Sequence, residues 1–531
     1  MMMGNNDNQN HKKIDKINSK NLNKKMQLHD DSRHEGRVGH DDTDGADTDS
    51  TILSLLYNIP KVELHAHLNG CIRETTLVEL AKERNVQLSS KLLTAGTQSS
   101  KNDEKKTKNS NQGTGSYSFY NMKPRNLKDC FDIFSELPNV MTDLVALRRI
   151  THETLVDFAT KDNVVYLELR STPKCLLYNH RNKSEVATKR DYIDAILSTM
   201  EEFMQSQPPP NRMICRLIIS VDRSLSYEEA KENIELAIEY SQQSPPLVVG
   251  VDLGGNPMKN SFQLFQPLFE RVREHNEKRN ITYNNATDTA AGTAPTTHPS
   301  KLGITIHCGE IPCAKADHET ETDTDSDGEA WKEAKCILKF HPDRLGHALL
   351  LPPDLQKELA NASIPIETCP TSNVMTLELN TNTNNKIKKN GQIDNDHDRQ
   401  HDHGNLIDGL KQHPILMEWI SQNHPICICT DDPGIFDTTL TKELYLLYKA
   451  FGERAKRKPK KRNDDEINIG DDDYDDRVDE ETLPSLLSSS LTVKQIATLV
   501  LQSMEYAFCD IETKVKVHDM IRDSIETRIG S

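Results

Sequence analysis

Apolar residues are scarce in this sequence. They make up 35% of the 531 residues, whereas an ordinary globular chain has about 45–50%. No apolar stretch approaches the roughly 18 residues that a membrane-spanning helix needs. The first 50 residues lack the apolar segment of a secretory signal, and they are too acidic for a mitochondrial transit peptide. These absences argue against a membrane or secreted protein and favour a cytoplasmic one.

Two kinds of residue spacing are also missing. The 11 cysteines do not follow the spacing of a disulfide framework, which is typical of reduced thiols in a cytosolic protein. Neither glycine-rich phosphate loop, G-x-G-x-x-G or G-x-x-x-x-G-K-[ST], occurs. The formal net charge of −17 makes the chain a poor general binder of nucleic acid.

The low apolar content has a local origin, because polar tracts dilute a chain that otherwise has ordinary apolar runs. These tracts bury too little apolar surface to offset chain entropy, so we expect them to be disordered. The first is an N-terminal tail, 1–50, and residues 51–531 are predicted to form a single domain. A basic run at 454–462 resembles a nuclear localisation signal. The polar insertions within the domain are 88–117, 279–300, 314–330, 377–405 and 455–482.

What the sequence does contain is a regular alternation of short β-branched runs with amphipathic segments. Near-continuous apolar strands that alternate with helices indicate a parallel sheet covered by helices. Eight such runs predict an α/β fold, a (β/α)8 TIM barrel, with a doubly wound open sheet as the alternative. The runs are Val62–His67, Val164–Arg170, Met213–Arg223, Leu247–Gly255, Leu302–Glu310, Arg344–Leu351, Ile364–Pro370 and Pro425–Asp432.

Residues able to bind a metal stand at the ends of several runs. His65 and His67 are two positions apart on a strand, so their side chains point the same way, and neutral imidazoles suit zinc. His307 lies near the end of the fifth run, and Asp431 and Asp432 end the eighth. In a barrel these strand ends meet at one face, where active sites lie. Taken singly, the histidines also suit a packed core, and the acids also suit a helix N-cap.

Other strand ends carry groups suited to catalysis or ligand binding. Glu310 follows Gly309, which permits a sharp turn, and an enclosed carboxyl group can stay protonated and donate a proton. A helix N-terminus would favour an acid there equally well. His347 is a candidate to orient or deprotonate a metal-bound water, and Gly255 lets the backbone approach a flat ligand. A phosphate site or an ordinary turn would both explain the segment Ser171, Thr172, Pro173 and Lys174.

Six strings occur in one order along the chain: KVELHAHLNG (61–70), VDLGGNP (251–257), HCGE (307–310), DRLGH (343–347), PTSN (370–373) and CTDDPGIF (429–436). With these strings the chain resembles the adenosine deaminase family of metal-dependent hydrolases. The resemblance implies one zinc ion per chain and attack of zinc-bound hydroxide on purine C6. The zinc ligands that it implies are His65, His67, His307 and Asp431.

The same resemblance implies a role for each remaining site residue. Glu310 would donate a proton to purine N1, and His347 would position the attacking water. Asp432 would contact N7 and the water, and the backbone at Gly255 would contact N3. The string HLNG has a neutral Asn69 where an acid would repel a 5′-phosphate. This feature resembles the adenosine deaminase-like branch, the N6-methyl-AMP deaminases. The expected substrate-binding residues are His67, Asn69, Ser171, Thr172, Pro173, Lys174, Asp222, Gly255 and Asp432.

The sequence therefore predicts a zinc-dependent hydrolase that converts N6-methyl-AMP to IMP and methylamine. Adenosine deaminase proper, which releases ammonia from adenosine, is the alternative activity. A catalytically inactive barrel that serves as a binding module is an alternative of another class, although every expected ligand and acid is intact. We expect a monomer that acts on a small purine nucleotide and binds neither nucleic acid nor membranes.

Overall fold

The computed structural model describes residues 44–89, 126–208, 212–288, 301–313, 325–379, 406–452 and 490–529. In this part of the chain no helix has both the length and the apolar character that a membrane span requires. Residues 1–43 of the predicted tail, the basic run 454–462 and the insertion 455–482 lie outside the described residues.

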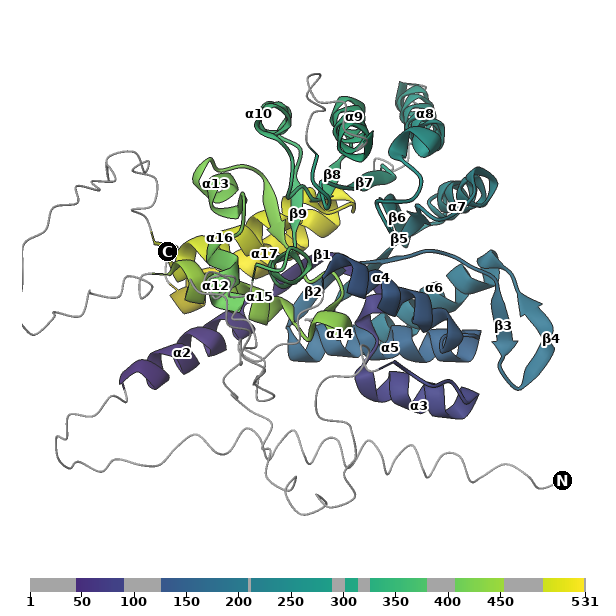
Figure 1. Cartoon of the computed structure of the whole chain (residues 1–531), viewed down its shortest axis with the longest axis horizontal. Coiled ribbons are helices and arrows are strands. Elements are labelled where there is room, and N and C mark those ends of the chain that lie inside the picture. Colours follow the sequence, from purple (N-terminus) through teal and green to yellow (C-terminus); the bar gives the residue numbers. More distant parts are fainter. Residues whose placement is uncertain are drawn as a thin grey trace, which may run out of the picture. The chain divides into compact units, whose positions relative to one another are not determined.

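Eight parallel strands follow one another around a ring, with helices on its outer side (Figure 1). The predicted (β/α)8 barrel is confirmed. An isolated bridge between Ala66 and Asp431 joins the last strand to the first. Most strand residues are fully buried, which is why the strands appear in the sequence as continuous apolar runs. The strands are β1 Lys61–His67, β2 Val164–Ser171, β5 Ile214–Asp222, β6 Val248–Gly254, β7 Gly303–Cys308, β8 Arg344–His347, β9 Ile366–Thr368 and β10 Ile426–Ile428.

The helices that cover the barrel begin at side chains able to cap them. Thr188 and Ser226 form capping boxes before α6 and α7, and Asp143 caps α5. The described helices are α2 Asp44–Asn58, α3 Glu74–Arg84, α4 Leu127–Glu136, α5 Leu144–Lys161, α6 Lys189–Ser206, α7 Tyr227–Tyr240, α8 Phe262–Asp288, α9 Asp325–Phe340, α10 Pro353–Ala362, α11 Pro370–Thr376, α12 Leu406–Lys411, α13 Leu416–Ser421, α14 Pro433–Phe436, α15 Leu440–Phe451, α16 Val493–Ser503 and α17 Ile511–Ile529, with short 3₁₀ turns η1 Leu68–Cys71, η2 Leu137–Asn139 and η7 Met504–Tyr506.

Three helices correct the predicted bounds of the polar tracts. Helix α2 begins at Asp44 inside the predicted tail, α8 continues to Asp288, and α9 begins at Asp325. Each helix packs apolar side chains on the barrel and extends from there into polar sequence. Adding a residue to an existing helix costs far less than starting one, so the helices run past the apolar pattern.

A two-stranded hairpin lies between β2 and α6, and the sequence pattern did not predict it. Its strands are β3 Leu176–Asn179 and β4 Asn182–Ala187, which pair antiparallel. All but one of the β4 residues are exposed. A strand with no buried face leaves no alternation of apolar and polar residues to detect.

The C-terminal segment closes the barrel at the end opposite the predicted site. The Phe508 ring lies 3.6 Å from the guanidinium carbon of Arg344, and its backbone N–H donates to Glu168 over 2.5 Å. Arg344 in turn pairs with Glu168 at 2.7 Å and with Glu367 at 2.6 Å. These charges are fully buried, so each depends on the others for compensation. A fixed polar layer therefore supports the strands beneath the site.

Candidate active site

The four predicted metal ligands converge at the C-terminal end of the barrel. Nε2 of His67 lies 3.1 Å from Nε2 of His65 and 3.2 Å from Nε2 of His307. Oδ1 of Asp431 lies 3.4 Å from Nε2 of His65 and 3.4 Å from Nε2 of His67. Ligand atoms about 2.0–2.1 Å from zinc, at tetrahedral angles, are about 3.3 Å from one another. The three imidazoles form one group able to hold a metal ion, and Asp431 lies with His65 and His347 in a second group that shares His65. The donor types and the distances above fit one metal ion at this cluster.

The backbone that carries this cluster is also the seam that closes the barrel. Asp431 donates its N–H to the carbonyl of His65 over 2.8 Å, and His67 donates to the carbonyl of Asp431 over 2.9 Å. Asp431 and His347 both have a φ of 63°. Left-handed backbone at residues other than glycine costs about 1–3 kcal/mol each and collects at functional sites. The seam therefore holds a ligand in a conformation that it would not adopt by itself.

Buried carboxylates fix the outer nitrogens of two of the histidines. Nδ1 of His65 lies 2.7 Å from Glu367, and Nδ1 of His307 lies 3.0 Å from Asp252. Arg170 joins the two carboxylates, at 2.9 Å from Glu367 and 3.4 Å from Asp252. A carboxylate on Nδ1 keeps the proton there and leaves Nε2 free to bind a metal. The sequence reasoning missed all three of these residues.

The two consecutive acids at the end of β10 have different surroundings. Ser372 donates to Oδ2 of Asp431 over 2.7 Å, which leaves Oδ1 directed at the histidines. Asp432 is buried, and among the described residues its Oδ1 has no hydrogen-bond partner. Burial raises the pKa of Asp432 well above its usual range, and the charges of Asp431 and Glu310 add to this effect. Asp432 is thus favoured in its protonated form, with one oxygen free for a ligand.

Gly70 packs directly against the side chain of Asp432, which leaves no room for a side chain at position 70. A Cβ at Gly70 would fall on the carboxyl group of Asp432. Gly70→Ala is therefore expected to displace Asp432 and to lower kcat/KM by about 100-fold, the usual effect of a misplacement near 1 Å. Steady-state kinetics and circular dichroism would test this. The control is Gly328→Ala in α9, and an active Gly70→Ala enzyme would show that Asp432 need not stay in place.

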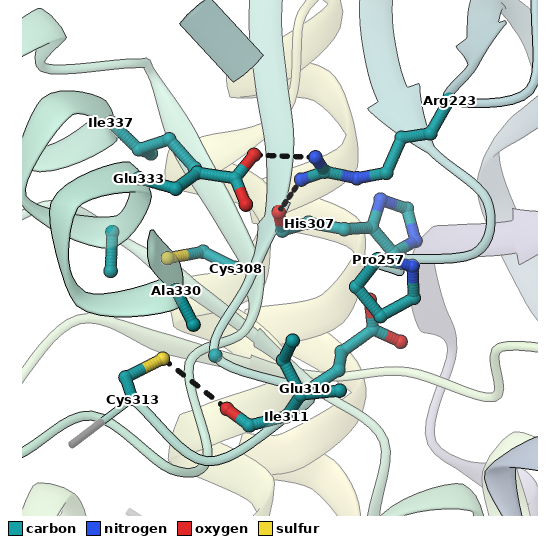
Figure 2. Close-up of a pocket in the computed structure, with 12 residues that line it drawn as sticks. Arg223, Pro257, His307, Cys308, Glu310, Ile311, Cys313, Ala330, Glu333 and Ile337 are labelled. Atoms are coloured by element: carbon teal, nitrogen blue, oxygen red, sulfur yellow. Dashed lines mark hydrogen bonds and ion pairs between the residues drawn. The ribbon is translucent and has the colours of Figure 1, made fainter. Parts of the chain in front are cut away.

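Glu310 and His347 face each other beside the metal-ligand cluster. Oε1 of Glu310 lies 3.7 Å from Nε2 of His347. Gly309 has a φ of 70°, so the predicted sharp turn before Glu310 is present. Figure 2 shows how Arg223 holds the loop that carries Glu310. Arg223 donates to the carbonyl of His307 over 3.1 Å and pairs with Glu333 of α9 at 2.5 Å.

Apart from Asp432, which follows β10, the predicted substrate residues lie at or just after the ends of the neighbouring strands β1, β2, β5 and β6. Asn69 is half-buried, and among the described residues its Oδ1 has no hydrogen-bond partner. Burial lowers the pKa of Lys174, and the nearby Asp222 opposes this shift. A Cβ at Gly255 would come within 2.8 Å of the carboxyl group of Asp222, and the φ of Gly255 is 87°, a conformation that strains residues other than glycine. These positions require glycine at 255 and bring an amide and a lysine to adjacent strand ends.

The segment after β2 is less open than the sequence suggested. Ser171 is buried, and its hydroxyl group lies 2.8 Å from the hydroxyl group of Tyr192. Pro173 is buried and Thr172 is half-buried. Of these residues, Thr172 and Lys174 are the more accessible to a ligand.

Comparison with known proteins gives a consistent result. A family model described as adenosine deaminase matches residues 60–287. The chain is 28% identical to an N6-mAMP deaminase of Arabidopsis thaliana, over 75% of this chain and 88% of that protein. It is 28% identical to an N6-methyl-AMP deaminase of Homo sapiens, over 74% of this chain and 83% of that protein. A solved ADAL–IMP complex is 25% identical, with a TM-score of 0.56, and the match covers 90% of this chain and 99% of that one.

The chain is thus similar to the adenosine deaminase family, over residues 60–287 by the family model and over 74–75% of its length by these relatives. These matches support the hydrolytic deaminase, acting on carbon–nitrogen bonds, that the sequence predicts. The match to the family model ends before His307 and Asp431. Their place beside His65 and His67 comes from the fold, which brings them within 3.4 Å.

One signal in the sequence would have revealed the missed residues. Arg170, Asp252 and Glu367 are charged residues inside otherwise apolar strands. A charge in a buried strand is seldom compatible with packing unless it is paired. The side chains of these three residues point into the barrel, where they contact one another and the ligands His65 and His307.

Proposed function

We propose that this protein is a zinc-dependent aminohydrolase of a purine nucleotide, and that its substrate is N6-methyl-AMP. The products would be IMP and methylamine. The observation that carries the choice of a nucleotide is the pair formed by Asn69 and Lys174 at adjacent strand ends, β1 and β2. A neutral amide and a lysine favour a 5′-phosphate, which a carboxylate at position 69 would repel. The relatives named N6-methyl-AMP deaminases support the same substrate.

Zinc is the metal that the donor set favours. Three imidazole nitrogens and one carboxylate oxygen are typical zinc ligands, and outer carboxylates on His65 and His307 are typical of zinc sites in proteins. The chemistry that zinc supplies when bound is activation of water at neutral pH. The residues that would hold it are His65, His67, His307 and Asp431.

The remaining side chains would act on the substrate itself. Water adds its oxygen to purine C6, the bond from C6 to the exocyclic nitrogen breaks, and the amine leaves with a proton. Glu310 would protonate N1 and so make C6 more electrophilic. Asp432, favoured as the protonated acid, would donate a hydrogen bond to N7, which is an acceptor. His347 would hold the attacking water, and the backbone at Gly255 would contact N3.

A panel of three substrates tests this proposal. Zinc-loaded protein is supplied with N6-methyl-AMP, AMP and adenosine, and the products are separated by chromatography. We expect N6-methyl-AMP to give the highest kcat/KM, with equal amounts of IMP and methylamine. Preference for adenosine would instead identify an adenosine deaminase proper. Inactivity on all three, together with absence of zinc, would favour a binding module.

Lys174 separates nucleotide from nucleoside recognition. Lys174→Ala is expected to raise KM for N6-methyl-AMP by about 10- to 100-fold, because a charge-assisted hydrogen bond to phosphate is lost. For N6-methyladenosine, which has no phosphate, KM is expected to stay within about twofold. Lys183→Ala, on the exposed strand β4, is the matched control. An equal change for both substrates would contradict a phosphate contact.

We further propose a cytoplasmic monomer. The proposed ligands and acids are all present in a single chain, so the site requires no residue from a second copy, and all eleven cysteines are free thiols, as a reducing compartment allows. Light scattering should therefore give a mass near 60.2 kDa.

A further inference from the structure

A chain of three side chains leads from His347 away from the ligand cluster. Nδ1 of His347 lies 3.2 Å from one end of the amide of Asn373, the last residue of the PTSN string. The other end of that amide lies 3.1 Å from Nε2 of His413. Asn373 is fully buried in α11, and His413 lies between α12 and α13. This chain connects a candidate catalytic imidazole with a histidine that has no other assigned role.

The far end of the chain determines where His413 carries its proton. The backbone N–H groups of Ile415 and Leu416 both donate to Nδ1 of His413, over 3.4 and 3.1 Å. An imidazole nitrogen that accepts hydrogen bonds has a free lone pair, so Nδ1 carries no proton. Burial lowers the pKa of His413 to about 4, so the ring is neutral at pH 7. The single ring proton is therefore on Nε2, which faces Asn373.

This proton decides which way the amide of Asn373 points. The structure places Oδ1 of Asn373 toward His347 and Nδ2 toward His413. The oxygen and nitrogen of an amide occupy nearly the same space, however, and their order is assigned from the hydrogen-bond partners. Nε2–H of His413 needs an acceptor, so the two ends of the amide must be exchanged, with the oxygen on the side of His413. The amide NH₂ then faces Nδ1 of His347, which must accept from it. Only this order gives all three contacts one donor and one acceptor.

We propose that Asn373 and His413 are positioning residues that hold His347 in the tautomer with its proton on Nε2. His347 then presents an N–H to the site, on the side where Glu310 lies 3.7 Å away. A donor at this position orients the attacking water by a hydrogen bond to its oxygen. A neutral ring whose Nε2 already carries a proton cannot remove one from the water. Of the two roles open to His347, orientation and deprotonation, this arrangement selects orientation. The inference rests on the proposed reaction only for the identity of the water.

The tautomer is directly measurable. Long-range ¹H–¹⁵N correlation spectra of zinc-loaded protein labelled with ¹⁵N-histidine distinguish the two tautomers, and His347→Gln identifies the His347 signals. We expect a protonated Nε2 and an unprotonated Nδ1 in the wild type. A proton on Nδ1 of His347, alone or together with Nε2, would overturn the proposal. This result does not depend on which purine is the substrate.

Two substitutions of equal size then test the role of His413. His413→Gln can still donate to Asn373, whereas His413→Glu, assayed at pH 8, can only accept. The Gln variant is expected to keep the wild-type tautomer and most of the activity. The Glu variant is expected to reverse the amide, move the proton of His347 to Nδ1 and lower kcat by about 100-fold, with KM nearly unchanged.

The control is His424→Gln, at a buried histidine whose Nε2 lies 3.0 Å from the carbonyl oxygen of Ile364. It should leave both the tautomer and kcat as in the wild type. Equal kcat values for the Gln and Glu variants at position 413, or a loss of activity without a change of tautomer, would overturn the proposal. Kinetics use whichever purine the wild type deaminates. If it deaminates none, the proposed function fails while the spectra still decide the tautomer.

Discussion

Glu310→Gln is expected to lower kcat by about 100- to 10,000-fold, the range that a positioned general acid contributes. Glutamine has the shape of glutamate but no acidic proton, so it removes the proposed transfer to purine N1 and little else. The side chain of Glu310 is 14% exposed and reaches to 3.7 Å from Nε2 of His347. It is therefore held within the site rather than in solvent.

The metal content of this variant should equal that of the wild type. Glu310 is not one of the four residues whose donor atoms lie together at the end of the barrel. Steady-state kinetics with N6-methyl-AMP and metal analysis measure the two effects separately. Glu329→Gln, in α9 with a side chain that is 68% exposed, is the control. A fall of less than about fivefold would mean that another group supplies the proton.

The barrel was predictable because a strand that is buried on both faces appears in the sequence as a short apolar run. All eight apolar runs contain a strand, although the observed strands β8, β9 and β10 are shorter than the runs. The candidate ligands were predictable for a related reason. His65, His67 and His307 interrupt apolar strands near their ends, and the ends of parallel strands meet at one face.

What the sequence could not predict depends on contacts between distant residues. Arg170 and Glu367 are 197 positions apart, and Phe508 and Glu168 are 340 apart. Local periodicity shows that such a residue is inside a strand but not which charge it meets across the barrel. The hydrogen-bond chain through Asn373 and His413 is of the same kind. The string PTSN is recognisable in the sequence. The function of its last residue, Asn373, depends on which side chain faces each end of its amide group.

Asp252→Asn is expected to weaken zinc binding by about 10- to 100-fold, the usual effect of losing an outer carboxylate of a metal-binding histidine. Burial by itself would raise the pKa of Asp252, but His307 and Arg170 hold it well below its usual range. Asp252 is therefore ionised, and it accepts the proton of Nδ1 of His307 over 3.0 Å. An asparagine can turn its NH₂ group toward Nδ1. The ring would then carry its proton on Nε2, where the metal ligand must have a lone pair.

Competition with a chromophoric chelator measures this affinity, and excess zinc should restore part of the lost activity. Ser220→Ala is the matched control, because Ser220 donates to the other oxygen of the same carboxylate over 3.0 Å. It removes a hydrogen bond without changing the charge or the contact with His307, so zinc affinity should change by less than about threefold. Wild-type affinity in Asp252→Asn would show that the backbone carbonyl of Leu253, also 3.0 Å from Nδ1, is sufficient to orient the ring. The size of the loss therefore measures how far the orientation of the His307 ring depends on Asp252 and how far it depends on the backbone carbonyl of Leu253.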